Sequence, residues 1–356
     1  MKIQQKIPCI VLAVAMFSAA SAVAQTSLVS AGGQGELNAA NNLQIAAPAD
    51  PDLVVGNDAC VKCHASEVKV WQSTPHATTF DQLHRKPEAK EIATKLGLRS
   101  IKHSGRCVAC HYTQQSDHGA ASSEDAAHVI AGVSCESCHG AAKQWLDLHH
   151  NYGGESVTRL TESPAHRAER ISQSIRAGMR NPTNVYLVAQ SCLRCHTTAD
   201  EELVNVGGHS AGSLDFEFVS WSQGTIRHNF LQSDGKVNGV RSAEHLRVMF
   251  VAGMIAELEA SLRATAAATQ KAKFGVTSAQ RADRAKKRLQ SVAAKVSDPI
   301  LQQILEIAGG VQLKLNHHAE LNAAADKIAA LGYEFAAQND GSTLANLDAY
   351  LPQTRK

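Results

Sequence analysis

The stretch Cys192-Leu193-Arg194-Cys195-His196 is the last of four segments that share one pattern, and this pattern decides the fold. The other three are Cys60-Val61-Lys62-Cys63-His64, Cys107-Val108-Ala109-Cys110-His111 and Cys135-Glu136-Ser137-Cys138-His139. We refer to them in chain order as motifs I to IV. In each motif the cysteines are three residues apart, which places their sulfurs on one face of a helical turn.

Cys-x-x-Cys-His is the sequence to which haem c is attached. Two sulfurs on one side of a turn can form thioethers along one porphyrin edge, and the following histidine reaches the iron as the proximal ligand. The pattern therefore predicts four covalently attached haem c groups, held by Cys60, Cys63, Cys107, Cys110, Cys135, Cys138, Cys192 and Cys195, with His64, His111, His139 and His196 on the irons.

Disulfides and structural zinc are two other uses that eight cysteines can have. Exported chains often carry disulfides, but a disulfide does not require a histidine after every cysteine pair. Structural zinc takes four ligands in a tetrahedron, and here each histidine lies too close to its own cysteine pair to join it easily at one ion. Both alternatives are less consistent with the repeated pattern than haem attachment is.

Composition agrees with a haem protein. The 356 residues contain 35 Lys and Arg, 33 Asp and Glu, and only 4% aromatic residues. No surplus of basic residues is evident on one face of the predicted fold, which argues against nucleic acid as a partner. Porphyrins supply large apolar surfaces where aromatic side chains are scarce. We therefore expect a mainly α fold whose residues 55–239 form a multihaem cytochrome c domain of short helices and loops wrapped around four haems.

The N-terminus is typical of a secretory signal peptide, residues 1–24. Lys2 and Lys6 precede an apolar stretch from Ile7 to Ala20, and Ala22-Val23-Ala24 forms a cleavage site. A membrane anchor is the alternative, but the apolar run is shorter than the roughly 20 residues that span a bilayer. The sequence predicts a periplasmic protein with no transmembrane anchor after cleavage, which loses Cys9 with the signal.

Two further regions flank the predicted haem domain. Residues 25–54 are rich in Ala, Asn, Gly, Ser and Gln and predict a flexible leader. Residues 240–356 lack cysteine and show helical periodicity, first through Leu246, Phe250, Met254, Leu258 and Leu262. We expect this region to form an antiparallel helical bundle that covers the haem domain or pairs subunits.

The bundle helices have predicted boundaries. Thr277 and Gln280 form a capping-box pattern that is expected to open a second, basic helix reaching about Val296. Asp298-Pro299 is expected to start a third helix. That helix is predicted to continue, with a bend at Gly309-Gly310, toward Gly332.

Thirteen histidines lie outside the motifs, and the identity of the sixth iron ligands decides the chemistry. A second histidine gives a six-coordinate iron suited to electron transfer, whereas an open position lets a small molecule bind. Gly207-Gly208 lets the backbone of His209 approach a flat ligand closely, and His228 follows Trp221 in a semi-apolar stretch. We predict both as distal ligands; three further candidates near motif II remain open: His103, His118 and His128.

Two segments resemble the tetrahaem cytochrome c-554 family. CVKCHASEVKVWQSTPHATTFDQL (60–83) is similar to its first haem segment and IAGVSCESCHGAAKQWLDLHH (130–150) to its third. The resemblance covers about residues 56–200 and implies that His76 and His149 are distal ligands, each to a neighbouring haem; His150 is the rival for the second position. The chain departs from the family at Gly140-Ala141-Ala142, where the family has Gly-Pro-Gly.

In the resembled family the second haem has no protein sixth ligand. If only one of His209 and His228 coordinates, the iron of motif II stays open here; if both do, all four irons are six-coordinate. We expect a tetrahaem electron carrier between redox partner proteins, through closely packed and mostly bis-histidine haems. A small-molecule oxidoreductase, for example a nitrogen-oxide reductase, at one open haem is the alternative. A third hypothesis is an interaction subunit of a larger haem complex, which self-associates through its C-terminal helices.

Overall fold

The computed structural model describes residues 47–116 and 127–353, and this part of the chain is mainly helical. The mainly α fold class is confirmed. The predicted signal peptide and most of the predicted leader lie outside the described residues. Within the described ranges, no helix is both long and apolar enough to cross a bilayer.

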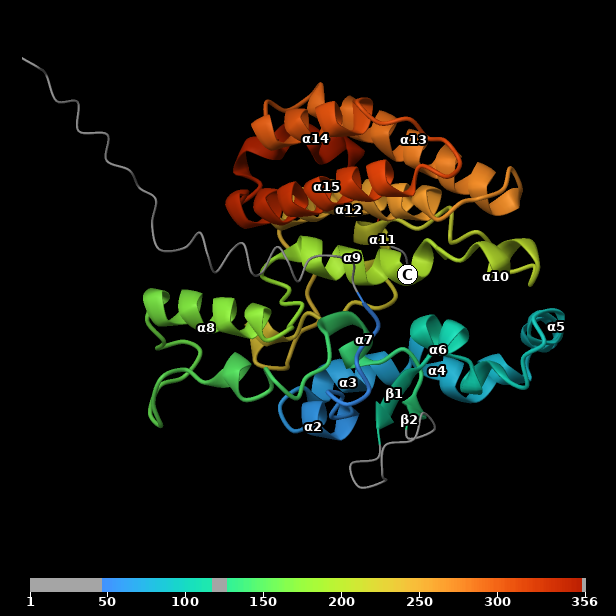
Figure 1. Ribbon diagram of the computed structural model, residues 1–356. Coiled ribbons are helices and arrows are strands. Elements are labelled where there is room, and N and C mark those ends of the chain that lie inside the picture. The colour runs from blue at the N-terminus through green and yellow to red at the C-terminus, as the bar shows by residue number, and fades with distance from the viewer. Residues whose placement is uncertain (1–46, 117–126, 354–356) are drawn as a thin grey trace, which may run out of the picture.

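The N-terminal half consists of short helices joined by loops, as expected (Figure 1). Its α-helices are α2 (Asn57–Val61), α3 (Ala65–Gln72), α4 (Pro75–Gln82), α5 (Pro87–Lys95), α6 (Gly105–His111), α7 (Cys135–His139), α8 (Pro164–Arg176), α9 (Val185–His196), α10 (Glu201–Asn205) and α11 (Phe218–Ser222). The single-turn 3₁₀ helices are η1 (Leu83–Arg85), η2 (Ile101–His103), η3 (Leu148–His150) and η4 (Leu231–Ser233).

A small antiparallel hairpin interrupts the helices, which the sequence did not predict. β1 (Thr113–Ser116) pairs with β2 (Ala127–Ala131), and the register shifts between Thr113 and Gln114. The hydroxyl of Thr113 lies 2.9 Å from the hydroxyls of both Ser134 and Ser137 and donates to a backbone carbonyl of Gly132 at 2.9 Å. The hairpin therefore connects the end of motif II to the start of motif III.

The C-terminal half is the predicted helical bundle. It contains α12 (Ala243–Ala266), α13 (Lys273–Ala293), α14 (Pro299–Gly309) and α15 (His318–Gln338), followed by the 3₁₀ segment η5 (Ser342–Tyr350). The start of α14 is as predicted, because the Asp298 carboxylate accepts hydrogen bonds from the backbone N–H groups of Ile300 and Leu301.

Two predicted boundaries in the bundle were wrong. α13 begins at Lys273, so Thr277 lies inside the helix and does not cap it. Phe274, which is fully buried, draws this extra turn into the core. The third helix does not bend at Gly309-Gly310 but ends there, and α15 is a separate helix.

One hydrophobic core joins the bundle to the last haem motif. α9 lies against α12 (Figure 1), and the buried cluster that includes Tyr186 and Leu193 on α9 also includes Leu258 and Phe335. The Tyr186 hydroxyl donates to the buried carboxylate of Glu259 at 2.5 Å, and the Gln190 amide donates to it at 2.7 Å. The bundle therefore packs against α9, the helix that carries motif IV.

Candidate haem-binding site

Three of the four motifs lie on helical turns as predicted. Motifs II and III occupy α6 and α7, and motif IV forms the C-terminal end of α9. In motif I, α2 ends at Val61, and His64 occupies the N-cap position of α3 without a capping hydrogen bond from its side chain. All eight motif cysteines are unbridged, and among the described residues no group of three or more His, Cys, Asp or Glu side chains converges as a metal site.

The structure places every motif histidine opposite one of the four predicted distal histidines, with interplanar angles that range from 26° for His64 and His149 to 87° for His139 and His228. The ring centroids are 6.3 Å apart for His64 and His149, 6.3 Å for His76 and His196, 6.1 Å for His111 and His209, and 6.2 Å for His139 and His228. Each pair joins different segments, so that motif I faces a residue after motif III and motif IV faces a residue after motif I.

These separations fit an iron held between two imidazoles. Two metal–nitrogen bonds of about 2 Å, plus about 1.2 Å from each nitrogen to its ring centre, place the centroids about 6.4 Å apart. Rings in direct stacking contact would lie closer than this. All four observed separations fall within a few tenths of an ångström of that value, which is the fit that bis-histidine haem requires of the chain.

Hydrogen bonds at Nδ1 orient five of the eight rings. Backbone carbonyls lie near Nδ1 of His149 (Leu146, 2.5 Å), His209 (Ser210, 2.8 Å), His228 (Ile226, 2.7 Å) and His139 (Arg180, 3.4 Å), and the Ser213 hydroxyl lies 3.0 Å from Nδ1 of His196. A carbonyl partner fixes the proton on Nδ1 and leaves the Nε2 lone pair for a metal.

Burial keeps several of these rings neutral. It lowers the pKa of His111, His139 and His196 to about 4, and the facing imidazoles lower it further. Burial also lowers the pKa of His76 and His149. Only the neutral imidazole can bind a metal, so these environments suit ligands at neutral pH.

The segment that carries His76 is fixed by contacts with motif II and with the end of β2. Thr79 Oγ1 donates to the carbonyls of both His76 (2.7 Å) and His111 (2.9 Å), and the Val133 N–H donates to the His76 carbonyl at 3.1 Å. Gly132 lies so close that a Cβ added there would be 2.4 Å from the His76 carbonyl oxygen. This position therefore requires glycine.

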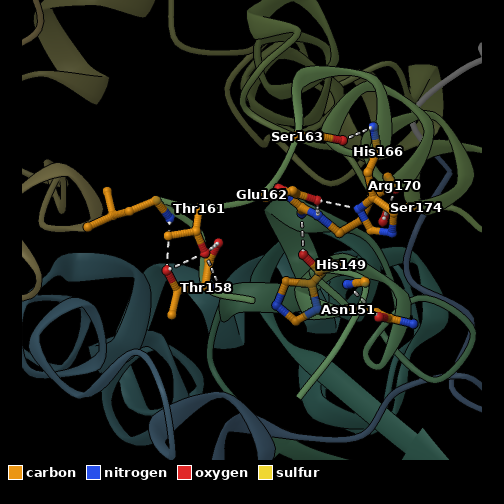
Figure 2. A network of polar contacts seen from close by, with 11 residues as sticks. His149, Asn151, Thr158, Thr161, Glu162, Ser163, His166, Arg170 and Ser174 are labelled. Atoms are coloured by element: carbon orange, nitrogen blue, oxygen red, sulfur yellow. Dashed lines mark hydrogen bonds and ion pairs between the residues drawn. The ribbon is translucent and has the colours of Figure 1, made fainter. Parts of the chain in front are cut away.

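A polar network supports His149, as Figure 2 shows. Arg170 Nη1 donates to the His149 carbonyl at 2.5 Å, while Nε and Nη2 of Arg170 donate to the two carboxylate oxygens of Glu162, each at 2.7 Å. His166 Nδ1 lies 2.7 Å from the same carboxylate. The side chain of Glu162 is fully buried, and the pairing with Arg170 lowers the pKa of Glu162 to about 2.

The sequence did not identify the contacts that join the four motifs. Arg194, within motif IV, donates to the carbonyl of Ala109 in motif II at 2.5 Å and to that of Ser137 in motif III at 3.5 Å. The buried carboxylate of Glu136 in motif III accepts from the N–H groups of Val55 and Gly56, just before motif I, at 3.0 and 2.9 Å. Residues at the variable positions of the Cys-x-x-Cys-His motifs, Arg194 and Glu136, therefore hold the segments together.

A cavity of about 410 Å³ runs between motifs II and IV. Its lining includes the four cysteines of these motifs and both of their histidine pairs, together with apolar residues such as Phe216 and Trp221. Phe216 stacks on the ring of His196 with a centroid separation of 4.5 Å. An apolar cavity of this size, with thiols and imidazoles facing into it, suits a porphyrin.

The bundle contributes directly to motif IV. Arg281 on α13 is buried, and its Nη1 donates to the His196 carbonyl at 2.8 Å while its Nε donates to Glu257 at 3.2 Å. Gly212, at a φ of 81°, lets the chain pass beside this contact, because a Cβ there would lie 2.5 Å from the His196 carbonyl oxygen. The sequence pattern of α13 showed only a basic helix and not this contact.

The remaining candidate histidines are not part of the facing pairs. His150 is exposed beside His149, with Nδ1 2.8 Å from the Leu146 carbonyl. His103 and His128 belong to none of the four pairs described above. His118 lies outside the described residues. Where the sequence differs from the resembled family, at Gly140-Ala141-Ala142, the Ala142 N–H donates to the Glu136 carboxylate at 2.8 Å. A side chain of motif III itself therefore closes this turn.

Comparisons with known proteins give matches over part of the chain. Residues 59–140, which hold motifs I to III, match the family described as "Cytochrome c554 and c-prime". Cytochrome c-554 of Nitrosomonas europaea is 30% identical over 100 residues, 28% of this chain. The match spans 43% of that relative's length. No solved structure matches the chain.

Proposed function

We propose that the whole chain is a tetrahaem c-type cytochrome that carries electrons between redox partners, in line with the match of residues 59–140 to the cytochrome c-554 family. The observation that carries the proposal is the set of four facing histidine pairs at 6.1–6.3 Å. When bound, haem iron with two imidazole ligands supplies reversible one-electron chemistry with little rearrangement.

The chain's own residues would perform four tasks. Two cysteines of each motif would anchor one porphyrin edge, and each pair of imidazoles would hold one iron from both sides. The Nδ1 hydrogen bonds at rings such as His149 and His209 would keep the ligand nitrogen directed at the metal. Arg194, by joining motifs II, III and IV, would keep neighbouring haems close enough for electron exchange.

A reductase at an open haem is the weaker hypothesis. It needs one iron without a second protein ligand, and the resembled family suggested motif II for this role. Here His111 faces His209 at 6.1 Å, as closely as any other pair. This geometry favours four closed irons and therefore a carrier.

We also propose that residues 1–24 direct export to the periplasm, where haem is attached to c-type cytochromes. A mass spectrum of the purified protein tests both export and haem number. We expect an N-terminus at Gln25 and the added mass of four haems. A chain that retains Met1, or one with fewer haems, would contradict the respective part of the proposal.

Electron paramagnetic resonance of the ferric protein tests the axial ligands. We expect low-spin signals from all four irons and no change when cyanide or nitric oxide is added. A high-spin signal from about one iron in four, lost on adding cyanide, would favour the reductase hypothesis instead.

A further inference from the structure

Basic residues outnumber acidic ones on and around α13. Residues 271–295 contain eight of the 35 Lys and Arg residues but one of the 33 acidic residues, leaving 27 basic and 32 acidic residues elsewhere. Six of the eight are exposed and define what we call the α13 basic face: Lys271, Lys273, Arg284, Lys287, Arg288 and Lys295. Composition alone predicts no such cluster; the structure shows one because α13 turns its apolar side inward.

Ion pairs neutralise only part of this face. Lys287 pairs with Asp283 at 2.7 Å and Arg288 with Glu257 at 3.0 Å. Among the residues that the structure describes, no ion pair reaches the ammonium groups of Lys271 and Lys273 or the guanidinium of Arg284. The face therefore keeps a surplus of positive charge that solvent alone screens.

The α13 basic face also lies next to two of the histidine pairs. Lys273 Nζ, on the face itself, donates to the His209 carbonyl at 3.4 Å. Arg281, on the inner side of the same helix, donates to the His196 carbonyl. Since a helix with its side chains is about 10–12 Å across, a partner on the outer side would be about one helix diameter from motif IV.

We propose that the α13 basic face is the docking surface for an acidic redox protein that exchanges electrons with the haems of motifs II and IV. This inference rests on the proposed function. Clustered charge raises the rate of association with an oppositely charged partner and orients the encounter. Net charge is a poor guide here: the 35 basic and 33 acidic residues nearly cancel over the whole chain, whereas the local charge beside the haem sites favours a negative partner surface.

The test uses flavodoxin hydroquinone as an acidic one-electron donor and follows haem reduction by stopped flow. In each turnover the flavin loses one electron to become the semiquinone, and one ferric iron becomes ferrous. The test variant is Arg284→Glu with Lys287→Glu. The matched control is Lys69→Glu with Lys236→Glu, two exposed lysines near motif I that bring the same change in net charge.

At low ionic strength we expect the Arg284/Lys287 variant to be reduced about tenfold more slowly than the wild type. The control should stay within about twofold of the wild type, and the difference should vanish at high salt, where charges are screened. Equal slowing of both variants would overturn the proposal, because net charge alone would then explain it. Unchanged haem spectra and circular dichroism establish that both variants fold.

Two further outcomes would overturn the proposal, because they would show that the α13 basic face binds another partner. In one, the wild type cosediments with phosphatidylglycerol vesicles and the Arg284/Lys287 variant does not. In the other, the wild type retards duplex DNA in a gel and the variant does not. Dithionite reduction separates this proposal from the proposed function. If dithionite reduces the haems of the wild-type protein but flavodoxin does not, the proposed docking surface is wrong, and the proposed carrier function still stands.

Discussion

The predicted distal histidines are held in place by different hydrogen bonds, and these decide how each histidine pair responds to substitution. His209 lies in a loop beside Gly208, which has a φ of 79°, and its ring is oriented by the adjacent Ser210 carbonyl. His149, in contrast, is tied through Arg170 to a buried carboxylate. His209 is therefore held by residues next to it in the chain, whereas His149 is held through a side-chain network that reaches Arg170 and Glu162.

His209→Ala should open the iron of motif II. With no second imidazole opposite His111, we expect a high-spin signal from about one iron in four and new binding of cyanide, measured by electron paramagnetic resonance and absorbance. His150→Ala is the matched control, since this ring is exposed and pairs with no motif histidine. A wholly low-spin spectrum for the His209 variant would remove His209 from the ligands.

Glu162→Gln should destabilise the fold in a pH-dependent way. Losing the charged hydrogen bonds to Arg170 should cost about 2 kcal/mol at pH 7. Because the folded pKa of Glu162 is about 2, below its ordinary 4.5, the stabilisation is complete above about pH 5 and is lost as the pH falls through 4.5 toward 2. Denaturant unfolding should show the difference from the wild type reduced by about half at pH 3; a difference independent of pH would contradict this.

At the scale of elements, the short connection from β2 to α7 controls where α4 places His76. Gly132→Ala would push a Cβ against the His76 carbonyl and Thr79 Oγ1. Since the neighbouring atoms are mostly backbone, we expect a loss of about 2 kcal/mol or more in stability and a disturbed spectrum for the iron of motif IV. Gly105→Ala, at the start of α6, meets no atom within 4 Å and serves as the control. Equal effects of the two substitutions would show that the close approach is unimportant.

The sequence predicted elements well where a local signal sets them. The helical turns of motifs II to IV and the Asp298-Pro299 start of α14 depend on neighbouring residues, and both were confirmed. It failed where distant packing decides. Burial of Phe274 moved the start of α13, and the hairpin β1–β2 has a mixed burial pattern that gives no alternation to detect. The sequence also could not predict which distal histidine lies opposite which motif histidine. That pairing depends on how segments more than 80 residues apart cross in the fold, as those of His64 and His149 do.

At the scale of the whole molecule, the haem-binding half and the bundle share a core, although their sequences look like separate regions. α9 ends in motif IV, while its Tyr186 and Leu193 belong to the same buried cluster as the bundle helices. Arg281 adds a direct contact from α13 to His196. A molecule built in this way should unfold as one unit, because the bundle cannot separate without exposing the apolar side of α9.

This cooperativity can be tested by disturbing the bundle and reading the haem. Leu289 on α13 is fully buried in the shared core, and Leu289→Ala should cost about 2–5 kcal/mol by leaving a cavity. We expect thermal unfolding followed by helix circular dichroism and by Soret absorbance to coincide in the wild type, and both transitions to move down together in the variant. Val276→Ala, on the exposed side of α13, is the control and should leave both nearly unchanged. A variant in which the helical signal melts earlier while the Soret transition stays in place would show two independent units, and the contacts of α9 and Arg281 with the bundle would then be too weak to couple them.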